Sequence, residues 1–246
     1  MAHIYIYSPS GAVRNVAGFR RAIQRLQQRG HEVEVDPDAL TTHQRFAGDD
    51  ATRVAAIERA AASGADIALL SRGGYGLTRI LPKLPYKRIA KAIEKGTRFV
   101  GLSDFTALQT ALLAKTGPAH ATTWAGNLLI DDWGQTGEPD EITEACFEDM
   151  ADGHSEGAGW VIPKKDLPAD EVPVLKKPVH DATLWGGNLC VLTSLLGTPY
   201  FPQIDKGVLF LEDVAEHPYR IERMLTQLLH AGVLDKQQAI LLGQFT

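Results

Sequence analysis

The feature of this sequence that most restricts its fold is the regular alternation of short apolar segments with helical ones. Four strands are expected, at residues 4–7, 31–35, 66–70 and 98–102. A segment with helical spacing follows each of them, at residues 19–26, 49–62, 87–95 and 105–113. The third strand, DIALL, is apolar after its first residue, as expected when both faces of a sheet are covered. The pattern therefore predicts an α/β fold with a parallel, doubly wound sheet.

The alternation ends after Pro118. Residues 124–137 have the composition of a loop, and residues 138–150 favour a helix. A stretch rich in glycine, proline and mixed charge follows and is typical of a linker. We therefore expect an N-terminal domain at 1–150, a linker at 151–178 and a C-terminal domain at 179–246.

The second domain is expected to be small. Gly186, Gly187 and Asn188 are predicted to open an apolar helix at 189–196. A buried strand at 207–211, an amphipathic helix at 219–229 and a second buried strand at 240–245 follow. A buried parallel strand normally has a covering element after it, so we expect this domain to be incomplete.

Composition excludes several classes of protein. The 246 residues are 44% hydrophobic and 22% charged, which is ordinary for a globular protein, and the net charge of −5 disfavours a nucleic-acid partner. The two cysteines are far apart in the sequence, which disfavours a disulfide framework or a cysteine zinc site. Neither a signal peptide nor an apolar run of about 20 residues is present, so no membrane association is expected. We predict a soluble, cytoplasmic protein.

A turn between the fourth strand and its helix holds a candidate nucleophile. In the sequence GLSD, Ser103 lies where the carboxyl edge of the sheet meets a helix, and the backbone N–H of Asp104 faces the same space. This placement is typical of a nucleophile elbow, although Phe105 stands where the usual pattern has a second glycine. The alternative is that Ser103 only caps the helix.

A glycine-rich run, RGGYG at 72–76, directly follows the third strand. Such a loop can donate backbone N–H groups to an anion or oxyanion, because glycine permits close approach and a positive φ. The alternative is a simple tight turn. The spacing matches neither a phosphate-binding loop nor a dinucleotide-binding fingerprint.

Glu212 ends an apolar strand and is a candidate for the acid that orients a histidine in a serine triad. The alternative is a capping or salt-bridge role beside Arg220 or Arg223, and two nearby acids could take either role: Asp213 and Glu216. Among eight histidines, His120 has the best position for a general base, at the end of a short strand after the elbow helix.

Five motifs occur in the order found in one family: SPSG at 8–11, RGGYG at 72–76, GLSD at 101–104, GGNL at 186–189 and LEDVAE at 211–216. The chain therefore resembles the LD-carboxypeptidases, the muramoyltetrapeptide carboxypeptidase group of serine peptidases, to which the microcin-immunity peptidases are related. The resemblance implies a flavodoxin-like N-terminal domain and a smaller C-terminal domain of mixed strands and helices.

The resemblance also implies an activity and its residues. LD-carboxypeptidases remove the terminal D-alanine of murein tetrapeptides in cytoplasmic wall recycling, with a Ser-Glu-His triad and without a metal or other cofactor. Ser103 matches the nucleophile and Glu212 the triad acid, while Gly74 and the N–H of Asp104 match the oxyanion hole. A homodimer is implied. From their placement we expect two residues to bind substrate: Arg72 and Asn188.

One feature departs from the family pattern. The family's triad histidine lies in a Gly-His segment downstream of the glutamate, and no counterpart precedes Thr246. We therefore expect a truncated chain that lacks its general base. Alternatives are a non-catalytic murein-peptide-binding protein, an inactive fragment, a microcin-immunity-type peptidase and, by fold analogy alone, a nucleotide- or small-molecule-binding domain.

Overall fold

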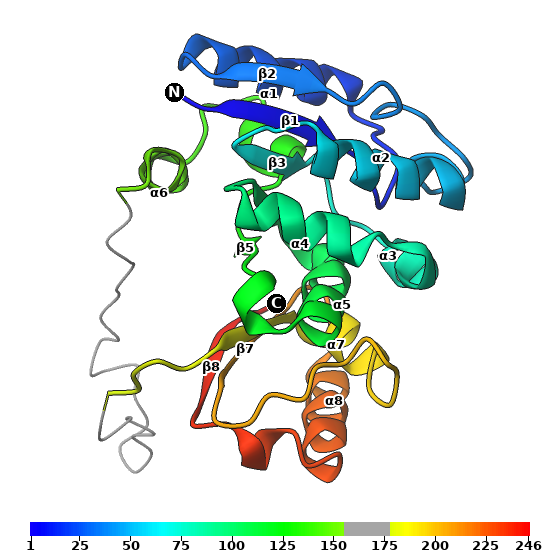
Figure 1. The fold of residues 1–246 in the computed structure, drawn as a ribbon, viewed down its shortest axis with the longest axis vertical. Helices are drawn as coiled ribbons and strands as arrows, with labels where there is room; N and C mark the ends of the chain where they lie inside the picture. Colours follow the sequence, from blue (N-terminus) through cyan, green and yellow to red (C-terminus); the bar gives the residue numbers. More distant parts are fainter. Residues whose placement is uncertain (155–177) are drawn as a thin grey trace.

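The computed structural model describes residues 1–154 and 178–246, and its strands form two parallel sheets (Figure 1). The first sheet has the strand order β2-β1-β3-β4-β5 and the second has the order β6-β7-β8. The strands are β1 (His3–Tyr7), β2 (Glu32–Val35), β3 (Ile67–Leu70), β4 (Arg98–Gly101), β5 (Trp124–Ala125), β6 (Leu184–Asn188), β7 (Val208–Asp213) and β8 (Ala239–Phe245).

Helices connect the strands in both parts of the chain. Within the described ranges, no helix is both long and apolar enough to cross a bilayer. The α-helices are α1 (Val16–Gln28), α2 (Asp50–Ala62), α3 (Leu77–Ile80), α4 (Tyr86–Glu94), α5 (Thr106–Thr116), α6 (Glu141–Asp152), α7 (Leu189–Ser194) and α8 (Pro218–His230).

The sequence of β1, HIYIY, explains why the first sheet is covered on both faces. Successive side chains of a strand point to opposite faces. Ile4 and Ile6 accordingly pack into one core with residues of α1 and α6, whereas Tyr5 and Tyr7 pack into another core with residues of α2, α4 and α5. The predicted doubly wound α/β sheet is therefore confirmed, and its 2-1-3-4-5 order is that of flavodoxin.

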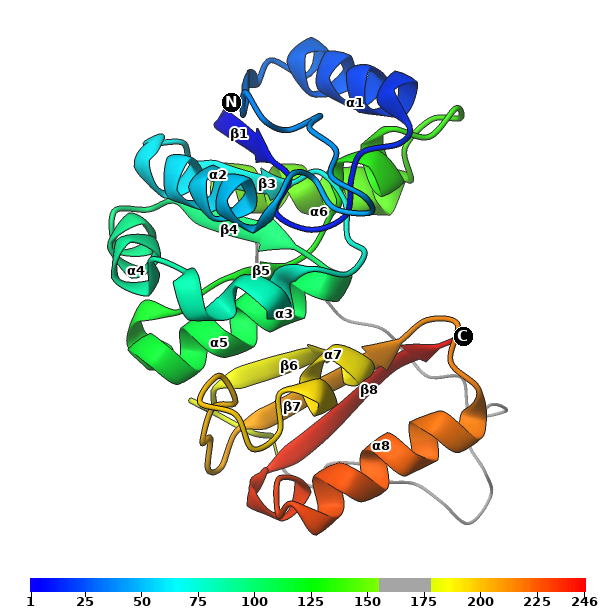
Figure 2. The same ribbon diagram turned by 90° about the vertical axis from the view of Figure 1, so that its right-hand side faces the viewer.

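The two sheets share one continuous apolar core. Figure 2 shows α5 between the first sheet and the elements of the second. Leu108 of α5, Leu192 of α7 and Leu209 of β7 are all fully buried in the same cluster. The apolar face of α5 thus joins the second sheet to the first.

Of two predictions for the segments after α5, the loop was wrong and the linker lies mostly outside the described residues. The predicted loop at 124–137 contains β5 and a π-helical turn, Leu129–Trp133. That turn buries Trp133 against α1, where Arg25 donates to the Trp133 carbonyl at 2.9 Å. The predicted linker lies outside the described residues, apart from 151–154 and 178.

Gly186, Gly187 and Asn188 form the end of β6, a strand that the sequence did not predict, and the predicted helix begins directly after them as α7, with Asn188 as its N-cap. Both glycines have positive φ, of 118° and 126°. A Cβ on Gly186 would lie 2.1 Å from the Phe210 carbonyl oxygen, and one on Gly187 would lie 2.6 Å from Thr106 Oγ1. The two glycines therefore allow β6 to lie close to β7 and α5. Because glycine has a low propensity for strands, the sequence did not indicate β6.

The last strand, β8, is present, but it is not buried as predicted. Ile240 is 40% exposed and Leu242 is 61% exposed. Within the described residues, β8 pairs only with β7, so it is an edge strand. Its apolar sequence indicated a strand correctly but did not indicate how much of it is covered.

Candidate active site

Ser103 occupies a strained position between β4 and α5. Its φ is +65°, a left-handed conformation that is uncommon for a residue other than glycine and is found preferentially at functional sites. Ser103 begins a short 3₁₀ turn, Ser103–Phe105, whose N-cap position is held by Leu102 without a side-chain hydrogen bond. The capping alternative is therefore not supported, and the strand-helix turn has the backbone expected of a nucleophile elbow.

The glycine-rich loop after β3 lies directly against Ser103. A Cβ on Gly73 would be 3.2 Å from Ser103 Oγ, so only a glycine leaves normal space beside the hydroxyl. The next residue, Gly74, has a φ of +111° and is exposed. Because β3 and β4 are parallel neighbours, the loops that follow them meet at one edge of the sheet. The structure thus brings together two predicted components of the site.

The side chain of Asp104 holds this edge together. Its Oδ2 accepts hydrogen bonds from Ser10 Oγ at 2.7 Å and from the backbone N–H of Leu77 at 2.9 Å. Burial raises the pKa of this carboxyl, and the two hydrogen bonds oppose that rise. The sequence suggested a role only for the backbone N–H of Asp104, so this positioning role of the side chain was missed.

Arg53 is a second positioning residue that the sequence analysis missed. It is fully buried on α2 and donates from Nη1 to the carbonyl oxygens of Pro9 at 3.2 Å and Gly76 at 2.8 Å. These bonds fix the loops after β1 and β3. A signal was present, because Arg53 shares one helical face with three buried residues: Ala56, Ile57 and Ala60.

Glu212 is connected to the elbow through β6. Asn188 is its register partner, and the N–H of Asn188 donates to Thr106 Oγ1 at 3.0 Å, three residues beyond Ser103. The side chain of Asn188 is buried and donates to Asp213 Oδ1 at 2.9 Å, while its Oδ1 accepts from Val191. These contacts do not support the predicted direct binding of substrate by Asn188, which has the contacts of a positioning residue.

The carboxylate of Glu212 has unmet hydrogen-bonding capacity. Its Oε1 is buried and has no partner among the described residues. Burial and, to a smaller extent, the charge of Asp213 raise the pKa of Glu212, while the Asn188 amide opposes that rise. In the described ranges Glu212 forms no ion pair with Arg220 or Arg223, and the salt-bridge role belongs to the nearby Glu216, which pairs with Arg220 at 3.4 Å. Asp213 instead accepts from backbone N–H groups of Cys190 and Val214.

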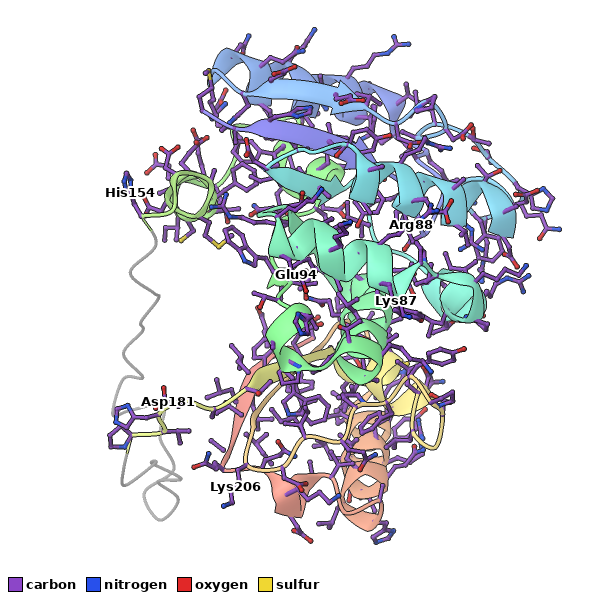
Figure 3. All side chains as sticks on the ribbon, in the orientation of Figure 1. Lys87, Arg88, Glu94, His154, Asp181 and Lys206 are labelled. Atoms are coloured by element: carbon purple, nitrogen blue, oxygen red, sulfur yellow. The ribbon has the colours of Figure 1, made fainter. Side chains whose placement is uncertain are left out.

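His120 is not placed as a base for Ser103. Its Nδ1 lies 2.7 Å from Oε1 of Glu94, which Figure 3 labels on α4. His120 follows the end of α5 whereas Ser103 precedes its start, and a helix of 11 residues is about 16 Å long. All eight histidines lie in the described ranges, and none of them hydrogen-bonds to Ser103 or Glu212.

The molecule is thus an α/β protein with two parallel sheets, the first in the flavodoxin order and with a serine on its strained strand-helix turn. The second sheet contacts the elements after that turn through the hydrogen bond from Asn188 to Thr106. Comparison with known families makes the class specific. Residues 4–123 match the LD-carboxypeptidase N-terminal domain and residues 181–246 match the LD-carboxypeptidase C-terminal domain. The chain belongs to the LD-carboxypeptidase family, a family of peptidases, which confirms the resemblance.

Individual relatives cover most of the chain. The structure of muramoyltetrapeptide carboxypeptidase from Oxalobacter formigenes is 36% identical, has a TM-score of 0.79 and covers 99% of this chain, which spans 77% of that protein. A protein of Streptomyces coelicolor that carries a carboxypeptidase name is 33% identical over 99% of this chain and 75% of its own length. The microcin C7 self-immunity protein MccF of Escherichia coli is 30% identical over 70% of this chain and 54% of its own length. A structure of MccF with aspartyl sulfamoyl adenosine has a TM-score of 0.79 at 25% identity and spans 99% of this chain and 77% of that one.

Proposed function

We propose that this protein is a cytoplasmic serine LD-carboxypeptidase that removes the terminal D-alanine from murein tetrapeptides. The observation that carries the proposal is the strained backbone of Ser103, whose Oγ faces the glycine loop. The 36% identity to a muramoyltetrapeptide carboxypeptidase supports the substrate class.

In this proposal Ser103 Oγ attacks the carbonyl of the bond between diaminopimelate and D-alanine. The N–H groups of Gly74 and Asp104 stabilise the resulting oxyanion, an effect worth about 3 kcal/mol per donor. A base takes the serine proton and returns it to the departing amine, and water then hydrolyses the acyl-enzyme. Glu212 contributes its Oε1, which has no hydrogen-bond partner among the described residues and is suited to accept the N–H of an imidazole base.

The test measures D-alanine release from the free tetrapeptide L-Ala-γ-D-Glu-meso-diaminopimelate-D-Ala. Because none of the eight histidines hydrogen-bonds to Glu212, the assay is run with and without imidazole in solution. We expect imidazole to increase release saturably, by tenfold or more, and Ser103→Ala to abolish it. A tetrapeptide that ends in L-alanine is the control for the L,D bond. Equal release by the parent chain and Ser103→Ala would refute the assignment of the nucleophile.

The same assay distinguishes two alternatives. The similarity to MccF favours a microcin-immunity-type peptidase, for which aspartyl sulfamoyl adenosine, the ligand of that MccF structure, is the test substrate. The lack of a hydrogen bond from any histidine to Glu212 favours a non-catalytic peptide-binding protein, which would bind the tetrapeptide but release no D-alanine even with imidazole. The homodimer stays a prediction, for which light scattering of the full chain is the measurement.

A further inference from the structure

A cationic cavity lies beside the proposed oxyanion hole. The loops that follow β1, β2 and β3 contribute one arginine each to it: Arg14, Arg45 and Arg72. The cavity has a volume of about 340 Å³ and is also lined by Gly11, Gly74 and Tyr75. Three neighbouring strands of a parallel sheet thus deliver three guanidinium groups to one place.

Hydrogen bonds hold these three loops together. The N–H of Gly11 donates to the Gly73 carbonyl at 3.3 Å, and the N–H of Ala12 donates to the Arg45 carbonyl at 2.9 Å. Arg72 Nη1 donates to the Ala12 carbonyl at 3.2 Å. These bonds therefore hold together the loops that carry the three arginines without the help of a ligand.

The charge of the cavity is unbalanced. None of its described lining residues is acidic, although the whole chain has a net charge of −5. Arg14 and Arg45 are exposed, and neither forms an ion pair with a described residue. Guanidinium groups that line one cavity and have no carboxylate partner among the described residues suit a carboxylate or phosphate, which arginine binds through paired hydrogen bonds. The loops after β1 and β3 also flank the switch point of the sheet, where this fold binds ligands.

The position of the cavity identifies which anion of a peptide it suits. Gly74 lines the cavity, and the adjacent Gly73 lies against Ser103 Oγ. One residue of extended chain spans about 3.5 Å, so an anion in the cavity is one or two residues from the carbonyl that Ser103 attacks. A carboxypeptidase substrate has its terminal carboxylate at that distance.

We propose that Arg14 and Arg45, together with Arg72, bind the terminal carboxylate of the peptide substrate. This inference rests on the proposed function and deepens it, because it explains why the enzyme acts on a chain end. A peptide without a free carboxylate leaves three positive charges without a counter-ion and binds weakly.

The test uses the full chain with Ser103→Ala, so that binding is measured without turnover. Isothermal titration compares the free tetrapeptide with its C-terminal carboxamide. We expect Arg14→Ala and Arg45→Ala each to weaken tetrapeptide binding about tenfold, with binding of the carboxamide unchanged, because each removes one charge-assisted contact. Lysine at either position retains part of the affinity. Arg88→Ala, which changes an exposed arginine of α4 labelled in Figure 3, is the matched control with unchanged binding.

The outcomes separate the two proposals. Unchanged tetrapeptide binding in Arg14→Ala/Arg45→Ala, an equal loss for both peptides, or no tetrapeptide binding to the parent overturns the carboxylate site. Arginine-dependent binding without Ser103-dependent release in the preceding assay refutes the activity and leaves the carboxylate site standing. Circular dichroism confirms that each variant is folded.

Discussion

At the scale of single residues, the site keeps groups in states that a folded chain normally avoids. Ser103 has a left-handed backbone, which costs about 1–3 kcal/mol for a residue other than glycine. Glu212 has a buried oxygen without a described partner. Both features are unfavourable for stability, and both are expected of a side chain whose partner is a bound ligand or a base.

The carboxyl group of Glu212 gives a pH-dependent prediction. Burial raises its pKa in the folded state, so between its unfolded and folded pKa values the folded protein binds more protons than the unfolded chain. The free energy of unfolding therefore falls as pH rises through this window. We expect Glu212→Gln to raise the melting temperature at pH 7, by no more than about 4 °C because solvent screens this half-buried group.

Melting curves of Glu212→Gln and the parent chain from pH 4 to pH 8 test this expectation. The difference in melting temperature between the two proteins narrows as pH falls toward about 4.3, the ordinary pKa of glutamate. Glu216→Gln is the control, since this nearby carboxylate pairs with Arg220 and lies outside the site. A destabilised Glu212→Gln at pH 7 would show that the carboxylate is better satisfied than its surroundings indicate.

At the scale of elements, the contact between two loops sets the space around the nucleophile. A Cβ at position 73 would lie 3.1 Å from the Ser103 Cβ, closer than side chains normally pack. Gly73→Ala is therefore expected to displace Ser103 by a few tenths of an ångström and to lower D-alanine release roughly tenfold, with little change in melting temperature. Gly137→Ala, where a Cβ meets no atom within 4 Å, is the matched control. Full activity in Gly73→Ala would mean that the loop does not confine the serine.

Only some of the helices and strands could be predicted from the sequence alone. Apolar periodicity predicted β1 to β4 and their helices because both faces of that sheet are buried, and the chain order placed Ser103 and the glycine loop at one edge. It missed β6, whose end is made of glycines that suit close packing, and it missed α3, which is a single turn. The roles of Arg53 and Asn188 depend on contacts with residues distant in the sequence, which local patterns do not reveal.

At the scale of the whole molecule, α5 makes the two sheets interdependent. Leu108 is fully buried in the core that both sheets share. Leu108→Ala is expected to cost about 2–5 kcal/mol and to lower amide-exchange protection in both β3 and β7. Hydrogen-exchange mass spectrometry makes the comparison. Leu242→Ala, at a position 61% exposed, is the matched control, with a change within about 0.5 kcal/mol. Loss of protection in β3 alone would mean that the sheets unfold separately.

The exposed edge of β8 has a consequence for handling the protein. Ile240 and Leu242 show apolar surface beside backbone groups that no described strand pairs. Such an edge is a template for strand addition between copies, so association rises with concentration, and a lysine on the strand opposes this association. We therefore expect a lysine in place of Leu242 to raise the concentration at which this chain remains monodisperse, as light scattering would measure.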